Sequence, residues 1–276
     1  MSDLEATPPP ASLPPALLDV RRLRKEYEDV VAVSDLSFSV APGEILGLVG
    51  PNGAGKTTSL RTIAGVLPVQ RGSVTVAGYD ITREERRAKR ALAWVPDDPQ
   101  PFDAMTVHEH LEFTASLYSV KDWRARADEL LELFELGPKR DALGGELSRG
   151  MRQKLAFCCA WLPRPSVVLL DEPLSGLDPR GIRSAKDAIL ELASEGAAVV
   201  LSSHLLDLVQ QLAARFLIFS NGRAIFDGTL EEARSLASAE DSDLEELFFR
   251  MTETGEFPER QTSPGAGSEA AEPPGE

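Results

Sequence analysis

The sequence contains little cysteine and no long apolar run. Its two cysteines, Cys158 and Cys159, are adjacent in a chain of 276 residues, which indicates a reduced compartment rather than a disulfide framework. No stretch approaches the roughly 18 consecutive apolar residues that a membrane-spanning helix needs. The first five residues lack the positive charge and the apolar core of a secretory signal. We therefore expect a cytoplasmic protein without direct membrane insertion, whose connection to a membrane requires a partner.

Positive charge is also scarce. Lysine and arginine total 29 against 44 acidic residues, which gives a formal net charge of −15. A chain built to coat nucleic acid is expected to be basic, so we do not expect nucleic acid as a partner. The apolar fraction of 42% is that of an ordinary globular protein, and the length suffices for one large domain or two small ones.

The two ends of the chain differ in composition from the rest. Residues 1–16 are rich in proline and alanine, which predicts a flexible N-terminal arm. Residues 253–276 are rich in glycine, proline, serine and glutamate without apolar periodicity, which predicts a disordered acidic tail. We favour a solubilising role for this tail over a docking role.

Strand and helix patterns alternate between these ends. Lys56–Val66 is predicted as a helix that Pro68 stops, and residues from about 104 to 162 are predicted to be mainly helical. An α/β core with a helical insertion in its middle follows from this order. The predicted strands are Leu17–Leu23, Val33–Val40, Glu44–Val49, Gly72–Val76, Ala91–Val95, Val167–Leu170, Ala197–Leu201 and Phe216–Phe219.

A glycine-rich segment directly follows the apolar run Glu44–Val49. It fits the spacing G-x-x-x-x-G-K-[ST] between a predicted strand and a predicted helix, a context that favours a phosphate-binding loop over a chance turn. Glycines let successive backbone N–H groups turn towards phosphates, and the helix start adds positive partial charge. We expect Lys56 to bind the β- and γ-phosphates and Thr57 to bind Mg²⁺. The expected nucleotide-binding residues here are Gly50, Pro51, Asn52, Gly53, Ala54, Gly55, Lys56, Thr57 and Thr58.

The strand Val167–Leu170 ends in two carboxylates. Beside a phosphate loop, Asp171 is expected to hold Mg²⁺ directly or through water, and Glu172 to orient and polarise the attacking water. An Asp-Glu pair after a strand is, by itself, usually the solvated start of a loop. Together the two motifs predict a nucleoside triphosphatase, and the sequence has no Asn-Lys-x-Asp motif that would favour a GTPase.

A third segment narrows the family. Residues 146–154, here named the signature segment, precede the acidic strand and resemble the signature sequence of ATP-binding-cassette (ABC) proteins. In that family the serine and the glycine bind the γ-phosphate held by the opposite subunit, which assigns this role to Ser148 and Gly150. An N-capping Ser148 leaves backbone N–H groups free for an anion. Out of context the same residues would be an ordinary helix start.

Further motifs of the family follow in order. Ser175–Pro179 resembles the loop after the acidic strand, in which Asp178 links the two active sites across a dimer. His204 matches the switch histidine, which donates a hydrogen bond to the γ-phosphate, although a lone histidine at a strand end is more often structural. Tyr27 matches the aromatic residue that stacks on adenine, with an ordinary surface tyrosine as the alternative. The resemblance covers about residues 17–237.

The sequence departs from the family's common pattern in two places. Asp97 occupies the place of the usual glutamine in the loop that joins the core to the helical insertion. An aspartate can still bind Mg²⁺ through water but is shorter and charged, and Gln100 is the alternative ligand. The signature segment has Arg149 and Met151 where glycine and glutamine are commonest. We expect both departures to affect the rate and the coupling more than the reaction itself.

The resemblance implies an α/β P-loop NTPase cassette, with a mixed-sheet RecA-like core, an antiparallel β subdomain and a helical insertion. Residues 17–237 would form this ATPase domain, and residues 238–252 a C-terminal helical element similar to one common in export-type cassettes. A generic amphipathic helix is the alternative for that last element.

The resemblance also implies a composite site. Two such domains, in a homodimer or heterodimer, would pair head to tail around ATP, with Lys56, Glu172 and His204 as the catalytic residues of one site. The opposite subunit would complete that site with Ser148 and Gly150. Catalysis of phosphoryl transfer then rests on positioning and charge stabilisation.

We interpret the chain as the ATP-hydrolysing subunit of an ABC transporter, with export favoured over import. A separate membrane permease would dock near Phe102–His110 and hold the subunit on the inner face of the cell membrane. The alternative is a soluble, non-transport ABC ATPase that acts on ribosomes or nucleic acid. A regulatory module that binds ATP without turnover is disfavoured by Glu172 and His204.

Overall fold

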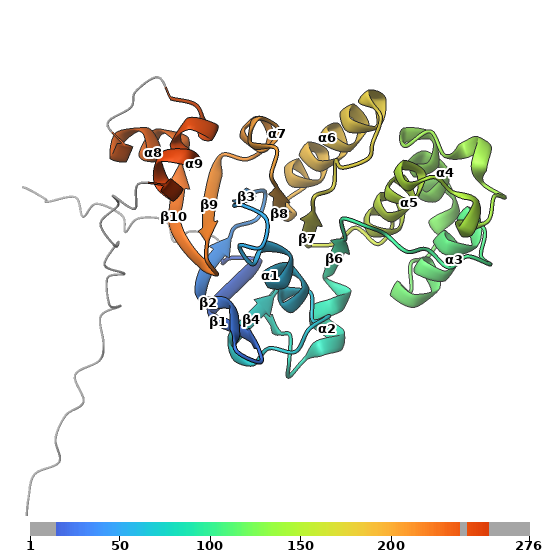
Figure 1. Cartoon of the computed structure of the whole chain (residues 1–276). Helices are drawn as coiled ribbons and strands as arrows, with labels where there is room; N and C mark the ends of the chain where they lie inside the picture. The colour runs from blue at the N-terminus through green and yellow to red at the C-terminus, as the bar shows by residue number, and fades with distance from the viewer. Residues whose placement is uncertain (1–14, 238–241, 254–276) are drawn as a thin grey trace, which may run out of the picture.

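The computed structural model describes residues 15–237 and 242–253 and arranges them as two β-sheets with helices around them (Figure 1). The predicted N-terminal arm, apart from residues 15 and 16, lies outside the described residues. The predicted acidic tail, apart from residue 253, lies outside them too. No helix in the described ranges is long and apolar enough to cross a membrane.

The smaller sheet is antiparallel and four-stranded, in the order β2-β1-β4-β5. β1 continues past its predicted end at Leu23, because it stays paired with β2 up to Tyr27, which lies opposite Val30. Its strands are β1 (Leu18–Tyr27), β2 (Val30–Val40), β4 (Arg71–Val76) and β5 (Tyr79–Asp80).

The larger sheet has six strands in the order β10-β9-β3-β8-β7-β6, and only β10 is antiparallel to its neighbour. The expected mixed-sheet core with a separate antiparallel sheet is thereby confirmed. The strands are β3 (Ile45–Val49), β6 (Leu92–Val95), β7 (Val167–Asp171), β8 (Ala198–Ser203), β9 (Arg215–Ser220) and β10 (Arg223–Thr229).

Both faces of the larger sheet are buried. In β7, Val168 and Leu170 belong to one hydrophobic cluster, whereas Val167 and Leu169 belong to the cluster on the other face. A parallel strand covered on both sides reads as a continuous apolar run, which is why β3, β7 and β8 were recognisable in the sequence. Strand β10 was not predicted, although the Asn221-Gly222 dipeptide before it, with φ of 48° and 75°, is a hairpin signal.

Helices cover both sheets. α1 (Lys56–Ile63) contacts β1, β2 and β7, and it ends before the predicted Val66 because Gly65 adopts a left-handed φ of 66°. The other helices around the sheets are α2 (Glu85–Arg90), α6 (Pro179–Ser194), α7 (Leu206–Leu212), α8 (Leu230–Ala237) and α9 (Leu244–Glu253). Figure 1 shows α8 and α9 at one end of the molecule.

A helical layer lies at the opposite end (Figure 1). It comprises α3 (Val107–Tyr118), α4 (Trp123–Leu133), the short 3₁₀ segments Gly137–Lys139 and Gly144–Glu146, and α5 (Arg149–Trp161). The start of α3 has a capping box, in which the side chain of Thr106 accepts from the N–H of Glu109.

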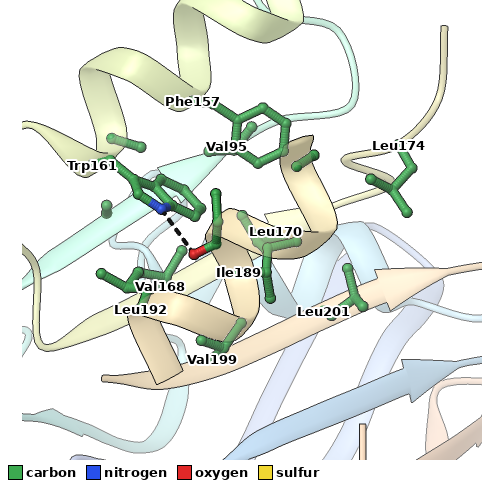
Figure 2. Packing of buried hydrophobic residues seen from close by; sticks show 14 of the residues in the cluster. Val95, Phe157, Trp161, Val168, Leu170, Leu174, Ile189, Leu192, Val199 and Leu201 are labelled. Atoms are coloured by element: carbon green, nitrogen blue, oxygen red, sulfur yellow. Dashed lines mark hydrogen bonds between the residues drawn. The ribbon is translucent and has the colours of Figure 1, made fainter. Parts of the chain in front are cut away.

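α5 attaches this layer to the sheet. Figure 2 shows Phe157 and Trp161 packed over apolar side chains of the strands and of α6. The Trp161 indole N–H donates a hydrogen bond of 3.3 Å to the carbonyl of Ala188 in α6. This buried contact satisfies the one polar atom of the indole and anchors the C-terminal end of α5 against α6.

Candidate active site

The predicted catalytic residues and magnesium ligands follow strands that end at one edge of the larger sheet. β3, β8, β7 and β6 are neighbours and parallel, so their carboxyl ends lie along the same edge. The glycine-rich loop follows β3, His204 follows β8, Glu172 follows β7, and Asp97 follows β6. Strand order rather than sequence order therefore brings these four segments together.

The glycine-rich loop is closely confined by its surroundings. Gly55 has a φ of 108°, and a Cβ atom there would collide with the carbonyl oxygen of Ala32. A Cβ atom on Gly50 would lie 2.5 Å from the carbonyl oxygen of Phe219. At position 55 only glycine fits, both because of the positive φ and because no side chain has room. α1 begins immediately afterwards, so its unpaired N–H groups face the loop.

Lys56 is 6% exposed and folded back over this loop. Its ammonium group donates to the carbonyl oxygens of Gly50 at 2.6 Å and Pro51 at 3.2 Å. Burial lowers the pKa of Lys56, while the negative charges of Glu172 and Asp171 act in the opposite direction. The loop thus holds one cation close to two carboxylates.

Thr57 and Asp171 form an oxygen-rich pair. The Thr57 hydroxyl donates to Asp171 Oδ1 at 3.1 Å, and the Ser202 hydroxyl donates to the same oxygen at 2.7 Å. A hydroxyl and a carboxylate are ligands that suit Mg²⁺, which binds proteins through one or two carboxylates together with substrate phosphates. Within the described ranges no group of three histidine, cysteine or acidic residues could hold a metal by itself. The pair fits a shared magnesium site.

Glu172 is held in an uncommon backbone conformation. Its φ is 47°, and its N–H donates to the carbonyl of Ser202 at 3.0 Å. Its carboxylate accepts from the Ser203 hydroxyl at 3.0 Å and lies 2.8 Å from His204 Nδ1. With Nδ1 as the donor, a neutral His204 leaves Nε2 as an acceptor, so donation from Nε2 requires the imidazolium form.

Ser202 and Ser203 are site residues that the sequence interpretation missed. Both follow the predicted strand Ala197–Leu201, and the sequence pattern assigns no role to either. The signal was present, because two adjacent hydroxyl side chains at the carboxyl end of a buried parallel strand face the edge where ligands bind.

Ser148, Gly150 and Asp178 form a second group around the start of α5. The Ser148 hydroxyl accepts from the N–H of Met151 at 3.3 Å, as expected for an N-cap. Asp178 caps α6 by accepting from the N–H of Gly181 at 3.1 Å. Its carboxylate lies 3.3 Å from Lys154 Nζ, and the hydrogen bond from Lys154 lowers the pKa of Asp178. The hydrogen bonds of Ser148 are local, so its predicted phosphate role depends on another copy.

Asp97 and Tyr27 lie at the margins of the site. Asp97 Oδ1 accepts from Arg149 Nη2 at 3.2 Å, and its role as a metal ligand stays a prediction. Gln100, the alternative ligand, donates to Asp98 at 2.7 Å. Tyr27 is 44% exposed at the tip of β1, with Lys25 Nζ 5.4 Å from its ring centroid. An exposed ring is available for stacking, and its contact with adenine also stays a prediction.

Comparisons with known proteins agree with this geometry. The family model described as ABC transporter matches residues 33–175. The chain is 32% identical over 239 residues to the ABC-type transporter ATP-binding protein EcsA of Bacillus subtilis (strain 168), covering 86% of this chain and 97% of that protein. It is 36% identical over 215 residues to the Nod factor export ATP-binding protein I of Burkholderia thailandensis, and the match covers 77% of this chain and 71% of that protein.

Among solved structures, one described as the ATP binding subunit of an ABC transporter superposes with a TM-score of 0.82 at 32% identity. The match covers 85% of this chain and 99% of that chain. Agreement over nearly the whole length of a single subunit supports the predicted fold class, which these likenesses confirm.

Proposed function

The chain belongs to the ATP-binding-cassette family of transporter ATPases, and on that premise we propose that it drives export through a separate membrane permease. Members of the family bind ATP and hydrolyse it to power transport. The observation that carries the proposal is the arrangement of Glu172, Ser203 and His204 beside the phosphate loop. A carboxylate held in place beside the phosphate loop can orient an attacking water, a role that nucleotide binding alone does not need.

In the proposed reaction the chain contributes orientation and charge. Glu172 accepts a hydrogen bond from the attacking water, with its carboxylate held in place by Ser203 and His204. Lys56 exchanges its two carbonyl contacts for phosphate oxygens and so compensates their negative charge. His204, whose Nδ1 lies 2.8 Å from the Glu172 carboxylate, would sense the terminal phosphate. This chemistry requires no covalent intermediate on the protein.

Mg²⁺ is the cation that the proposed site would hold. Thr57 and Asp171 supply the hydroxyl and carboxylate oxygens, and the ion would supply charge neutralisation at the phosphates. Ser202 donates to the same Asp171 oxygen that Thr57 contacts, which keeps the carboxylate oriented. Asp97 would act on this ion through water only after exchanging its contact with Arg149.

We further propose that two copies of the domain, or this domain and a related one, pair head to tail. Ser148 makes only local hydrogen bonds at the exposed start of α5, which leaves its neighbouring N–H groups available to a second copy's nucleotide. Asp178, the N-cap of α6, lies 3.3 Å from Lys154 in the second turn of α5. Pairing would complete each site with the other subunit's signature segment.

The proposed permease contact lies between the loop after β6 and the helical layer. A cavity of about 310 Å³ there is lined by Trp94, Gln100, Pro101, Tyr118, Arg152 and Cys159, among others. Beside it, Phe102, Phe113 and Leu117 are between 48% and 63% exposed. Exposed aromatic and aliphatic side chains next to a groove are typical of protein interfaces.

Two observations support export and a membrane-peripheral location. A relative at 36% identity is named for Nod factor export. The described residues contain no helix that could span a membrane, so the transport path would belong to a partner chain. The cargo would then be selected by that partner.

The test is affinity purification of a tagged Glu172→Gln variant from gently solubilised cells with ATP present. Glutamine keeps the size of Glu172 but removes the carboxylate, so ATP should be held without turnover and the dimer retained. Recovery of a polytopic membrane protein in near-equal amount is the expected result.

The control is Glu191→Gln on the exposed surface of α6, which should hydrolyse ATP normally. Recovery of ribosomes or nucleic-acid proteins instead of a permease would favour the soluble alternative. A Glu172→Gln variant that neither binds ATP nor dimerises would count against the composite site.

A further inference from the structure

Arg149, the first residue of α5, joins two loops that leave neighbouring strands. Its Nη2 donates to Asp97 Oδ1 and to the Ser175 hydroxyl, each at 3.2 Å. Asp97 follows β6 and Ser175 follows β7. One cation therefore connects the start of α5 in the helical layer with two loops at the edge of the larger sheet.

The backbone around Arg149 is closely packed. A Cβ atom on Gly150 would lie 2.7 Å from the carbonyl oxygen of Gly176. Gly176 has a φ of 75°, and a Cβ atom there would lie 3.3 Å from Arg149 Cδ. Further along α5, Lys154 Nζ lies 3.3 Å from Asp178. α5 thus contacts the loop after β7 along one side, with Arg149 at the end of this contact.

The ion pair unites two departures from the family's common pattern, since Asp97 replaces a glutamine and Arg149 a glycine. Their side chains are 48% and 55% exposed. Exposed ion pairs contribute little to overall stability, because water screens them. A pair of this kind is suited to setting the position of two segments and is poorly suited to holding the fold together.

We propose that Arg149 is a positioning residue that sets the place of the signature segment relative to Glu172. It does so by holding Asp97 on one side and Ser175 on the other, and Ser175 lies three residues after Glu172 in the same loop. The Asp97 carboxylate serves as the anchor for Arg149. Without the contacts of Arg149 with Asp97 and Ser175, the helical layer can shift relative to the edge of the larger sheet while each part stays folded.

The first experiment measures amide hydrogen exchange in the nucleotide-free chain and so does not depend on the proposed function. Arg149→Ala should raise the exchange rate in peptides covering residues 96–101 and 174–178 by about three- to tenfold. The reason is that the free energy of local opening falls when the hydrogen bonds from Arg149 are removed. Arg149→Lys, which keeps the charge but not the planar fork, should give an intermediate increase.

The matched control is Arg140→Ala. Arg140 donates to Asp128 at 2.7 Å within the helical layer, so its removal deletes an exposed ion pair without touching either loop. Exchange in both loops should equal that of the unaltered chain. Unchanged exchange in Arg149→Ala would overturn the inference, as would an equal rise in the control.

The second experiment exchanges the two charges. Asp97→Arg and Arg149→Asp should each raise loop exchange, and Arg149→Asp should lower kcat by about tenfold with the KM for ATP within about twofold, because positioning rather than binding is lost. The double variant should recover the loop exchange of the unaltered chain, because the ion pair is restored with its charges exchanged. If the effects of the two single variants on loop exchange simply add in the double variant, the two residues are not coupled. If exchange responds as expected while the unaltered chain lacks ATPase activity, the proposed function fails and the positioning role stands.

Discussion

Glu172 shows how the surroundings of one residue determine its orientation. A φ of 47° places it in the left-handed region, where a residue with a side chain bears strain of about 1–3 kcal/mol. Three neighbours offset this strain, namely the carbonyl of Ser202, the hydroxyl of Ser203 and the ring of His204. The carboxylate is thereby held in one orientation at the strand end and does not rotate freely into solvent.

Ser203→Ala tests this orientation. The Ser203 hydroxyl donates to Glu172 and also accepts from the N–H of Leu205, so its loss should loosen the carboxylate without removing it. We expect kcat for ATP to fall by about tenfold with KM little changed. Steady-state ATPase kinetics measure both values. The control is Ser194→Ala at the end of α6, and a Ser203→Ala variant with the parent's kcat would refute the positioning of Glu172.

Helix starts are the elements that present the second group of site residues. α6 begins with Asp178 as its N-cap and Pro179 at its first position, a combination that favours a sharp helix start. α5 begins with Ser148 as its N-cap. The two helix starts are joined by the Lys154–Asp178 ion pair, so the capping residue of α6 also anchors α5.

Asp178→Asn separates capping from charge, because asparagine caps a helix about as well as aspartate. The hydrogen bond from Lys154 lowers the pKa of Asp178 below its ordinary value of 3.8. The contribution of the charge to stability is therefore present above 3.8 and is lost as pH falls through the lowered pKa. We expect the variant to be slightly less stable at pH 7 and equal to the parent at the acid end. Urea unfolding over a pH series measures this, and a difference independent of pH would contradict it.

Across the whole molecule, Arg215 joins the two sheets. From β9 its guanidinium donates to Asp227 in β10 at 2.6 and 2.8 Å. The same group donates to Glu44 at 2.8 Å and to the carbonyl of Ser39 in β2 at 2.9 Å. These hydrogen bonds raise the pKa of Arg215, so its charge persists throughout the working range of pH. β3, which precedes the phosphate loop, is paired with β9, and Leu46 lies opposite Arg215.

Arg215→Met should destabilise the chain by about 1–3 kcal/mol, because two half-buried carboxylates lose their shared cation. Arg215→Lys should lower the free energy of unfolding by less than Arg215→Met does. Lysine keeps the positive charge, although it lacks the planar guanidinium that binds two partners at once. Denaturant unfolding gives both values. Arg140→Ala, which deletes the exposed pair with Asp128, should stay within about 0.5 kcal/mol of the parent. Equal effects of Arg215→Met and Arg140→Ala would mean that Arg215 does not join the sheets.

Several elements were predictable because their signals are local. The buried strand Val167–Leu170 differs from β7 by one residue, since a run of apolar residues between a polar turn and two carboxylates has few alternatives. The helix after Lys56 was placed correctly at its start but continued too far, because the stop at Gly65 depends on a left-handed backbone. β10 and α2 were missed because their apolar positions are few.

The sequence alone determined the class of chemistry. The phosphate loop with Lys56 and Thr57, the carboxylates after β7 and the signature segment each lie within a few consecutive residues, where spacing and residue type are sufficient. It also determined the family, which the comparisons confirm.

Only the tertiary structure decided which residues act together. Ser203 meets Glu172, and Arg149 meets Asp97, because strand order places β7 between β8 and β6, although these strands are far apart along the chain. No local pattern records such a pairing, since it depends on the register of parallel strands and on where α5 packs against the sheet. The physical reason is that a hydrogen bond reaches about 3 Å in space, whatever the separation in sequence.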